Sequence, residues 1–223
     1  QRLRVWFGKQ GAMALVSHLD LVRLFDRAVR RGALPIAYTG GFHPGPRIAI
    51  ANALPLGASS RGEIVDFDLT EALDPTDFQA RLSAVLPADI PVYRVEAVDP
   101  QSPAATQQLT EASYQLTLAV DEPIATAQWQ TWTAEILARQ ALWWEKNTKR
   151  GKKVTLNLRE QLLALSVVEV TPAAITVQYT GTCRNDGTQL QPRHLVYLFE
   201  QVSGLSFQLT HIHRLGLILD SIN

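Results

Sequence analysis

The sequence predicts an α+β fold in which one order of elements, β-α-β-β-α-β, occurs twice along its 223 residues. Short runs of alternating apolar and polar residues indicate half-buried strands, and longer runs with apolar residues three or four apart indicate helices. A polar, proline-containing segment at 99–108 separates the two sets. The repeated order is that of the split βαβ motif, so we expect tandem duplicated ferredoxin-like units with antiparallel sheets. The expected boundaries are 1–99 for the first domain, 100–112 for a linker and 113–223 for the second domain.

The first half gives the clearest local signals. Ser17 and Asp20 form a capping box, in which the serine hydroxyl accepts from the amide of Asp20 and the carboxylate reaches back to the cap. The helix that follows repeats apolar residues at helical spacing and ends at Gly32. The strands and helices expected in this half cover residues 3–7, 14–16, 18–32, 47–51, 63–69, 77–86 and 91–98.

The second half repeats the order with one ambiguous stretch. A long helix is expected over 126–146, including Trp143 and Trp144, and the segment 154–170 reads as extended or partly helical. Within it, Leu158 to Leu165 fits either a short helix or a continued strand. The other expected elements are a strand at 113–120, a strand at 174–179, a helix at 192–202 that opens with Pro192, and a strand at 207–219.

Composition limits the class of protein. The single cysteine, Cys183, excludes an intrachain disulfide and a cysteine-ligated iron–sulfur cluster, and it is typical of a cytoplasmic protein. Apolar runs are far shorter than the roughly 20 residues of a membrane span, and the first residues lack the apolar core of a signal peptide. We therefore expect a cytoplasmic protein with no membrane partner. The chain begins at Gln1, as expected of a segment cut from a longer polypeptide.

The net charge of zero conceals segregated charges. Residues 1–61 hold nine basic and two acidic side chains, residues 62–138 hold thirteen acidic and two basic ones, and residues 139–160 hold seven basic and two acidic ones. Such asymmetry creates local fields, unless opposite segments neutralise each other in the fold. Both outcomes are compatible with the sequence.

The first helix carries a row of arginines. At helical spacing they lie on one face, opposite the apolar stripe. Guanidinium groups match phosphate oxygens, so the row suits a nucleic-acid backbone, although a solvated helix face would look the same. These residues are Arg23, Arg27, Arg30 and Arg31.

The loop at 38–47 packs three glycines, two prolines, a histidine and an arginine between two apolar runs. Glycine permits positive φ and proline stiffens the path, so the loop is shaped rather than slack. Gly41, Phe42, His43 and Arg47 are its candidate substrate contacts. His18 at the helix start and His43 are the candidate general acid–base residues. If the fold brings the loop to the helix start, the histidines and Arg47 would share one site.

A second basic segment follows Trp143 and Trp144 and contains Lys149, Arg150, Lys152 and Lys153. Aromatic rings beside cations suit base stacking with phosphate neutralisation, whereas solvated lysines at the end of a helix are the alternative. His211 and His213 alternate on a strand and face one side, but no acidic third ligand is evident, so we expect no metal site. The chain contains no phosphate-binding GxxxxGK[ST] loop, no GxSxG elbow and no HExxH motif, so we expect no catalytic activity of its own.

Several of these segments together resemble the radical-SAM-linked protein family, a domain of unknown function beside or fused to the C-terminus of cobalamin-binding radical SAM proteins. In the family's usual loop, His43 stands at an Asn or Ser position and Gly45 at a His position. The second half is similar more loosely, through the basic turn at 149–153 and through Pro192-Arg193-His194-Leu195. The motifs that carry the resemblance are Ser17-His18-Leu19-Asp20-Leu21, Arg27-Ala28-Val29-Arg30-Arg31, Gly41-Phe42-His43-Pro44-Gly45-Pro46-Arg47, and Leu54-Pro55-Leu56-Gly57 with Glu63 and Asp66.

The resemblance implies a radical SAM partner that holds SAM, the iron–sulfur cluster and cobalamin, with no cofactor in this chain. Tandem ferredoxin-like units also look like the RAMP-type CRISPR repeat-processing endoribonucleases. Three hypotheses follow. The first is a non-catalytic accessory domain that recognises structured RNA for a radical SAM modification enzyme. The second is a protein-interaction module that docks on that enzyme or on a protein substrate, and the third is a metal-independent endoribonuclease.

Overall fold

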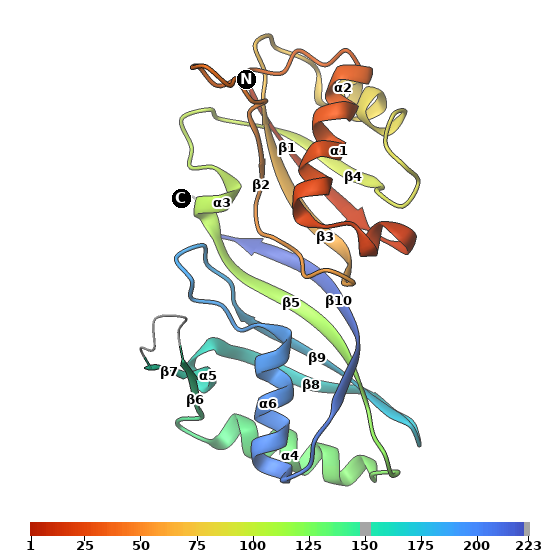
Figure 1. Ribbon diagram of the computed structural model, residues 1–223, viewed down its shortest axis with the longest axis vertical. Helices are drawn as coiled ribbons and strands as arrows, with labels where there is room; N and C mark the ends of the chain where they lie inside the picture. Colours follow the sequence, from red (N-terminus) through yellow and green to blue (C-terminus); the bar gives the residue numbers. More distant parts are fainter. Residues whose placement is uncertain (148–152, 221–223) are drawn as a thin grey trace. The chain divides into compact units, whose positions relative to one another are not determined.

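A computed structural model describes residues 1–147 and 153–220 and shows a mixed α+β fold with mostly antiparallel strand pairing (Figure 1). The chain divides into two compact units. Unit 1 comprises Gln1–Thr110 and Arg214–Asn223, and unit 2 comprises Glu111–His213. The division differs from the boundaries expected from sequence, because residues 100–110 and the C-terminal segment from Arg214 pack into unit 1.

Unit 1 contains a sheet in which β1 pairs antiparallel with both β3 and β4, and β2 pairs antiparallel with β3. The C-terminal part of β10 lies on the other side of β3. The elements of this unit are β1 (Arg2–Lys9), the 3-10 helix η1 (Gly11–Leu15), α1 (His18–Arg31), β2 (Ile48–Ile50), β3 (Ser59–Asp68), α2 (Pro75–Ser83), β4 (Val92–Val98), α3 (Ala105–Gln108) and the end of β10 (Gln208–Leu219).

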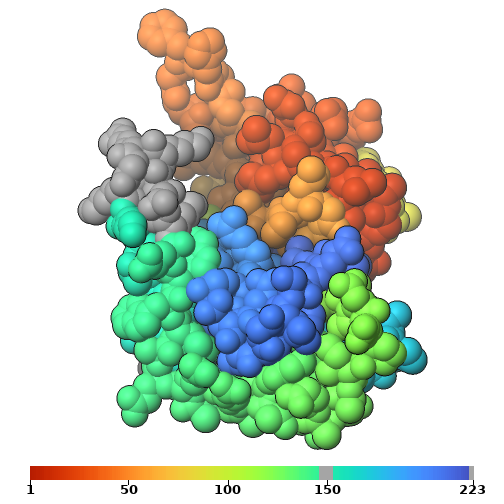
Figure 2. Space-filling view, turned by 60° about the horizontal axis from the view of Figure 1, so that its bottom comes forward, coloured from red at the N-terminus to blue at the C-terminus, as the bar shows by residue number. Residues whose placement is uncertain are grey.

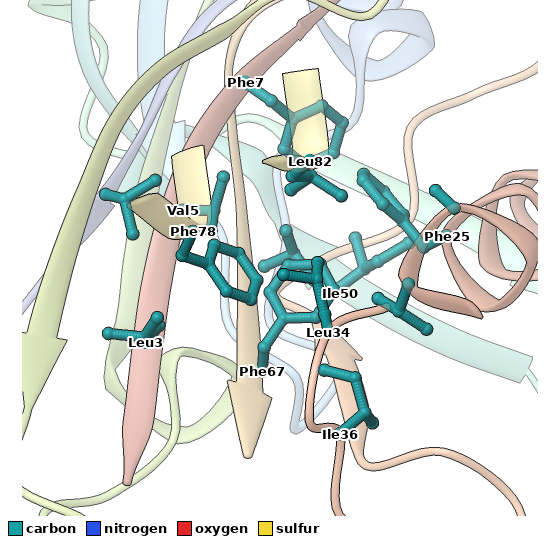
Figure 3. Close-up of a cluster of buried hydrophobic side chains, with 14 of the residues drawn as sticks. Leu3, Val5, Phe7, Phe25, Leu34, Ile36, Ile50, Phe67, Phe78 and Leu82 are labelled. Carbon is teal, nitrogen blue, oxygen red and sulfur yellow. The ribbon is translucent and has the colours of Figure 1, made fainter. Parts of the chain in front are cut away.

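The core of unit 1 lies between this sheet and the helices α1 and α2 (Figure 3). Alternate residues of β1 point into it, which is the strand pattern read from the sequence. Four rings form a continuous chain of contacts: Phe7 to Phe25 at 5.1 Å, Phe25 to Phe67 at 5.7 Å, and Phe67 to Phe78 at 5.3 Å between centroids. Offset and edge-to-face aromatic pairs of this kind add about 0.5–1.5 kcal/mol each beyond burial. The core therefore fixes α1 and the strands that hold the loop at 38–47.

Two expectations for the first half are wrong in detail. Residues 14–16 are not a returning strand, since 11–15 form the 3-10 helix η1. The segment expected to be a linker contains α3 and the first residues of β5, and Ala105 and Gln108 are buried. It docks because the carboxylate of Asp66 accepts from the backbone N–H of Ala105 at 2.7 Å and Arg4 donates to Gln108 at 2.6 Å.

Unit 2 contains a sheet in which β5 and β8 both pair antiparallel with β9, and α4 and α6 cover it (Figure 1). The N-terminal part of β10 lies beside β5. A separate two-stranded hairpin, β6–β7, follows α4. The elements are β5 (Leu109–Ala119), α4 (Thr126–Ala138), β6 (Trp143–Asn147), β7 (Lys153–Asn157), α5 (Leu158–Gln161), β8 (Leu162–Val170), β9 (Ala174–Thr182) and α6 (Pro192–Ser203).

The expected helix over 126–146 is too long, because α4 ends at Ala138 and both Trp143 and Trp144 lie on β6. The apolar spacing of three and four residues stops at Ile136, and aromatic residues favour strands. The ambiguous stretch resolves into a single helical turn, α5, between β7 and β8. Asn157 caps this turn by accepting from the backbone N–H of Arg159, and the same oxygen accepts from Leu142.

Among the residues that the structure describes, no helix is both long enough and apolar enough to cross a membrane.

Candidate functional site

The loop at 38–47 is closed at its neck by hydrogen bonds from backbone N–H groups. Tyr38 and Pro46 form an isolated bridge, the N–H of Thr39 donates to the carbonyl of Gly45 at 2.9 Å, and the N–H of Gly45 donates to the hydroxyl of Thr39 at 3.0 Å. At the tip, Phe42 is fully exposed and Gly41 takes a φ of 106°, which favours glycine. Figure 2 shows the loop as the orange projection at the top. The loop is thus shaped as expected, and it presents an aromatic side chain to solvent.

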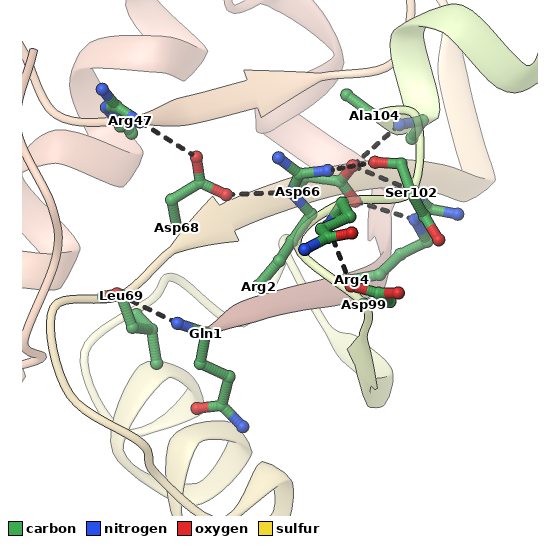
Figure 4. Close-up of polar contacts among 12 residues, drawn as sticks. Gln1, Arg2, Arg4, Arg47, Asp66, Asp68, Leu69, Asp99, Ser102 and Ala104 are labelled. Atoms are coloured by element: carbon green, nitrogen blue, oxygen red, sulfur yellow. Dashed lines mark hydrogen bonds and ion pairs between the residues drawn. The ribbon is translucent and has the colours of Figure 1, made fainter.

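A pocket of about 290 Å³ lies under the neck of this loop. Its charged lining is mixed, because Arg2 and Arg47 both approach Asp68, at 2.9 Å and 3.9 Å (Figure 4). Arg2 is fixed further by donation to the carbonyl of Ser102 at 2.8 Å. Arg47 is more than half exposed and only loosely paired, so its guanidinium is able to turn toward a ligand in the pocket.

The four arginines of α1 are all exposed, and the opposite stripe of the helix is buried, as predicted. Arg23 pairs with Asp20 at 3.0 Å and Arg30 pairs with Asp26 at 3.0 Å, within the same helix. These carboxylates reduce the field of the row without covering its guanidinium groups, since exposed pairs of this kind are worth about 1 kcal/mol or less.

The arginine row adjoins the loop through Arg30. The Asp26 carboxylate, and after it the hydroxyl of Tyr38, raises the pKa of Arg30 above its ordinary value. Tyr38 opens the loop, so the last turn of α1 and the loop form one continuous exposed surface. We call this the α1–loop surface and define it by Arg23, Arg27, Arg30, Arg31 and the loop at 38–47.

The start of α1 lies at the far end of that helix from the loop at 38–47. The cap forms largely as predicted, since the backbone N–H of Asp20 donates to the Ser17 hydroxyl at 3.2 Å. The Asp20 carboxylate accepts from the same hydroxyl at 2.7 Å rather than from the cap backbone, and this bond, together with Arg23, lowers the pKa of Asp20. His18 is the first residue of α1 and Arg30 comes twelve residues later, about 18 Å along a helix. The structure therefore does not gather His18 with His43 and Arg47.

Part of the segregated charge is neutralised inside unit 1. Arg4 donates to both oxygens of Asp66, at 2.8 Å and 3.0 Å, and both side chains are buried. In this pair and in the pair of Arg2 with Asp68, a basic side chain from residues 1–61 neutralises an acidic side chain from residues 62–138. The alternative that opposite segments neutralise each other thus holds for these two pairs in the sheet, whereas the four arginines of α1 stay exposed.

A second buried network holds the C-terminal strand in unit 1. Arg214 donates to the two oxygens of Glu63 at 3.1 Å and 2.9 Å and to Asn52 at 2.9 Å. Lys9 is buried beside them and donates to the carbonyl of Ala14 at 3.0 Å. Burial lowers the pKa of Lys9, Glu63 opposes that shift and Arg214 reinforces it. The carboxylate of Glu63 thus faces two buried cations, and its ion pair with Arg214 ties the C-terminal strand to unit 1.

In unit 2, the two tryptophans of β6 point to opposite faces of the hairpin. Trp144 packs against His194 at 4.6 Å between ring centroids, with the guanidinium of Arg193 5.8 Å from its ring, whereas Trp143 is 59% exposed. Of the predicted basic turn, Lys153 lies on β7, 4.0 Å from Glu145, and Lys149, Arg150 and Lys152 lie outside the described residues.

His211 and His213 face one side of β10, as predicted, with ring centroids 6.5 Å apart. Within residues 1–147 and 153–220, no group of three or more His, Cys, Asp or Glu side chains is arranged to hold a metal ion.

The sequence did not predict the pocket that Arg2 and Asp68 line, nor the position of the exposed Trp143 on a strand. The alternation of Arg2, Arg4 and Trp6 with buried residues was a usable signal for a polar sheet face. The ion partners came from a strand more than sixty residues away, and no single-sequence pattern specifies that pairing.

Together these features define a mixed α+β protein with a mostly antiparallel sheet and exposed arginine and tryptophan side chains. The chain belongs to the family described as "Uncharacterized protein conserved in bacteria (DUF2344)", whose model matches residues 2–192. A comparison with curated proteins found no match.

Three solved structures share the fold. A chain of a Cbf5-Nop10-Gar1 complex is similar with a TM-score of 0.57 at 8% identity, over 96% of this chain and 48% of that chain. A chain of an archaeal box H/ACA sRNP Nop10-Cbf5 complex gives 0.52 at 7% identity, over 95% and 46%. A chain of an H/ACA RNP bound to a substrate RNA containing 2'-deoxyuridine gives 0.51 at 7% identity, over 96% and 46%. This chain therefore spans about half the length of the solved chains it matches.

Proposed function

We propose that this protein is a non-catalytic RNA-recognition domain that serves a cobalamin-binding radical SAM modification enzyme. The observation that carries the proposal is the α1–loop surface, on which four exposed arginines of one helix face adjoin a shaped loop with Arg47 at its base. Guanidinium groups bind phosphate oxygens in a bidentate manner, and a row along one helix suits a nucleic-acid backbone.

The fold supports the same proposal. Two of the structural neighbours come from ribonucleoprotein complexes, one of them bound to a substrate RNA. We also infer that the two units are duplicated ferredoxin-like units. In unit 1 the strands run in the order β4-β1-β3-β2, and in unit 2 the order is β10-β5-β9-β8. Each order places the first and third strands of its unit at the centre.

The radical SAM partner rests on the resemblance of the loop and helix motifs. This chain has one cysteine, which is buried, so the partner would hold the three-cysteine cluster together with SAM and cobalamin. The role left for this chain is to bind and orient the substrate.

Filter binding of tRNA and rRNA fragments over a salt series tests the proposal. We expect the logarithm of the affinity to fall linearly with the logarithm of the salt concentration. Replacing Arg23, Arg27 and Arg31 by Gln should weaken binding for all sequences. It should also reduce the salt slope by about one for each arginine that no longer binds a phosphate.

Arg61→Gln is the matched control, because it removes one exposed charge on β3 outside the α1–loop surface. The salt series starts at about 50 mM, on the order of the lowest salt in such titrations. The RNA role would be refuted by no binding at this lowest salt, or by binding that does not depend on salt. If Arg27→Gln alone and Arg61→Gln weaken binding equally, only net charge matters and the α1–loop surface is not the binding site.

A specific observation supports protein docking as the second candidate. Leu15, Leu19 and Leu56 are exposed by 74%, 67% and 68%. They come from η1, from the first turn of α1 and from a loop that meets η1, where the N–H of Gly57 donates to the carbonyl of Ala14 at 3.0 Å. Exposed apolar clusters are typical of protein contacts. Co-purification with the radical SAM enzyme that disappears in Leu19→Ser but persists in the α1 arginine variants would support this candidate.

A further inference from the structure

One face of the β6–β7 hairpin presents an aromatic ring to solvent. Successive residues of a strand point to opposite sides, so Trp144 is directed toward His194 while Trp143 is on the opposite, exposed face of the hairpin. Fully burying a large apolar side chain stabilises a protein by about 1.5–3 kcal/mol. Unit 2 gains less than half of this from Trp143, since the residue is 59% exposed.

The backbone on both sides of Trp143 is nevertheless fixed. Its carbonyl accepts from the hydroxyl of Tyr197 on α6 at 3.2 Å. The preceding residue, Leu142, is buried, and its N–H donates to the side chain of Asn157 at 3.0 Å. Trp143 also pairs directly with Asn157 across the hairpin. The ring is therefore held outward by an ordered backbone and loses little freedom when a ligand covers it.

The surroundings of the ring are polar and include a cation. Glu145 and Lys153 share the outer face of the hairpin with Trp143, since residues two and four apart on paired strands point the same way. Lys153 lies four residue steps along the strand from Trp143, about 13 Å. Its ion pair with Glu145 is long, at 4.0 Å, and both side chains are mostly exposed. The ammonium is thus available to a phosphate near a base stacked on the ring.

We propose that Trp143 stacks on an unpaired base of single-stranded RNA, with Lys153 contacting a neighbouring phosphate. In a duplex each base already stacks on its neighbours, so its face is not open to a protein ring, whereas unpaired bases stack on exposed aromatic side chains. The site therefore selects unpaired segments, such as loops and ends. This inference rests on the proposed RNA role, but it uses unit 2 alone and is independent of the α1–loop surface.

Fluorescence anisotropy with the full chain tests the stacking site. The probes are a labelled single strand of about 12 nucleotides and a labelled duplex of about 12 base pairs, because known single-strand sites cover roughly 4–16 nucleotides. Stacking of one base is worth about 1–3 kcal/mol by alanine substitution, so Trp143→Ala should weaken binding of the single strand by about 5- to 150-fold. Duplex binding should be unchanged. Trp143→Phe should keep most of the affinity, because it retains a ring.

The matched control is Tyr93→Ala, which removes an exposed aromatic ring from β4 in unit 1. If the unchanged protein binds neither probe, the proposed RNA role fails and this inference fails with it. If the protein binds RNA but Trp143→Ala affects both probes equally, or neither, the stacking site is overturned and the RNA role stands. Loss of a co-purifying protein in Trp143→Ala, with RNA binding unchanged, would overturn it in favour of a protein contact.

Discussion

Replacing Glu63 by Gln should destabilise unit 1 strongly, because it removes the carboxylate that faces two cations in the buried network. Glu63 and Arg214 are exposed by 1% and 0%, and two of the hydrogen bonds of Arg214 go to Glu63. Glutamine preserves the size of the side chain and one acceptor oxygen. It takes away the negative charge that offsets the buried cations Arg214 and Lys9.

Removing one partner of a buried ion pair costs about 3–5 kcal/mol. Arg214 is unable to relieve this cost by losing its proton, since guanidinium stays charged in proteins. Lys9 is able to relieve part of it, because its pKa is already lowered by burial and loses the opposing effect of Glu63 in the variant. We therefore expect a loss of about 3–5 kcal/mol, a large share of the roughly 5–15 kcal/mol that stabilises a typical domain.

Urea denaturation followed by far-ultraviolet circular dichroism measures the loss, and hydrogen exchange of peptides from β1 and β3 assigns it to unit 1. Tryptophan fluorescence reports mainly on unit 2, because unit 1 contains only Trp6. The matched control is Glu96→Gln, whose pair with Arg94 is about half exposed and should be worth about 0.2–1 kcal/mol. If the two variants lose the same stability, the reasoning about the buried network is wrong.

Three further outcomes are expected. In the unfolded chain Lys9 stays protonated up to about its ordinary pKa of 10.5, whereas the folded protein releases that proton at lower pH. The free energy of unfolding should therefore rise with pH in the window between the two pKa values. In urea titrations, Lys9→Met should flatten this rise. Gly62→Ala should lower the free energy of unfolding by about 1–3 kcal/mol, because the added Cβ would lie 2.4 Å from the Cα of Gly216. Gly216→Ala is the control, because its added Cβ meets open space and should cost less stability. Equal losses of stability in thermal unfolding would contradict this expectation. Incubation with RNA in the presence of EDTA should give no cleavage, and cleavage that disappears in His18→Ala or His43→Ala would instead establish a ribonuclease.

Local patterns in the sequence predicted most of the elements of unit 1. The alternation in β1, the helical spacing of α1 and the cap at Ser17 each involve residues close together in the chain, so their chemistry is visible without the fold. The expected helix over 126–146 failed because its last third has no helical period. Its two tryptophans take a strand conformation through pairing with β7, which begins only at Lys153.

The candidate site was predicted in part. The exposure of the α1 arginines followed from the apolar stripe opposite them, and the shape of the loop followed from its glycines and prolines. The position of the loop beside the end of α1, rather than beside His18, depends on the packing of α1 on the sheet. The exposure of Trp143 depends on a strand register, in which a shift of one residue would exchange it with Trp144.

The sequence by itself determined an α+β chain with a basic helix face, a shaped loop and no cysteine set for a cluster, because composition and short-range period are local properties. Only the tertiary structure decided which charges remain for a partner. Two ion pairs between distant segments are neutralised in the interior, where an unpaired charge would be costly: Arg4 with Asp66, and Arg214 with Glu63. The arginines of α1 and the ring of Trp143 remain at the surface, since the burial of one face of a helix or hairpin leaves the opposite face in water.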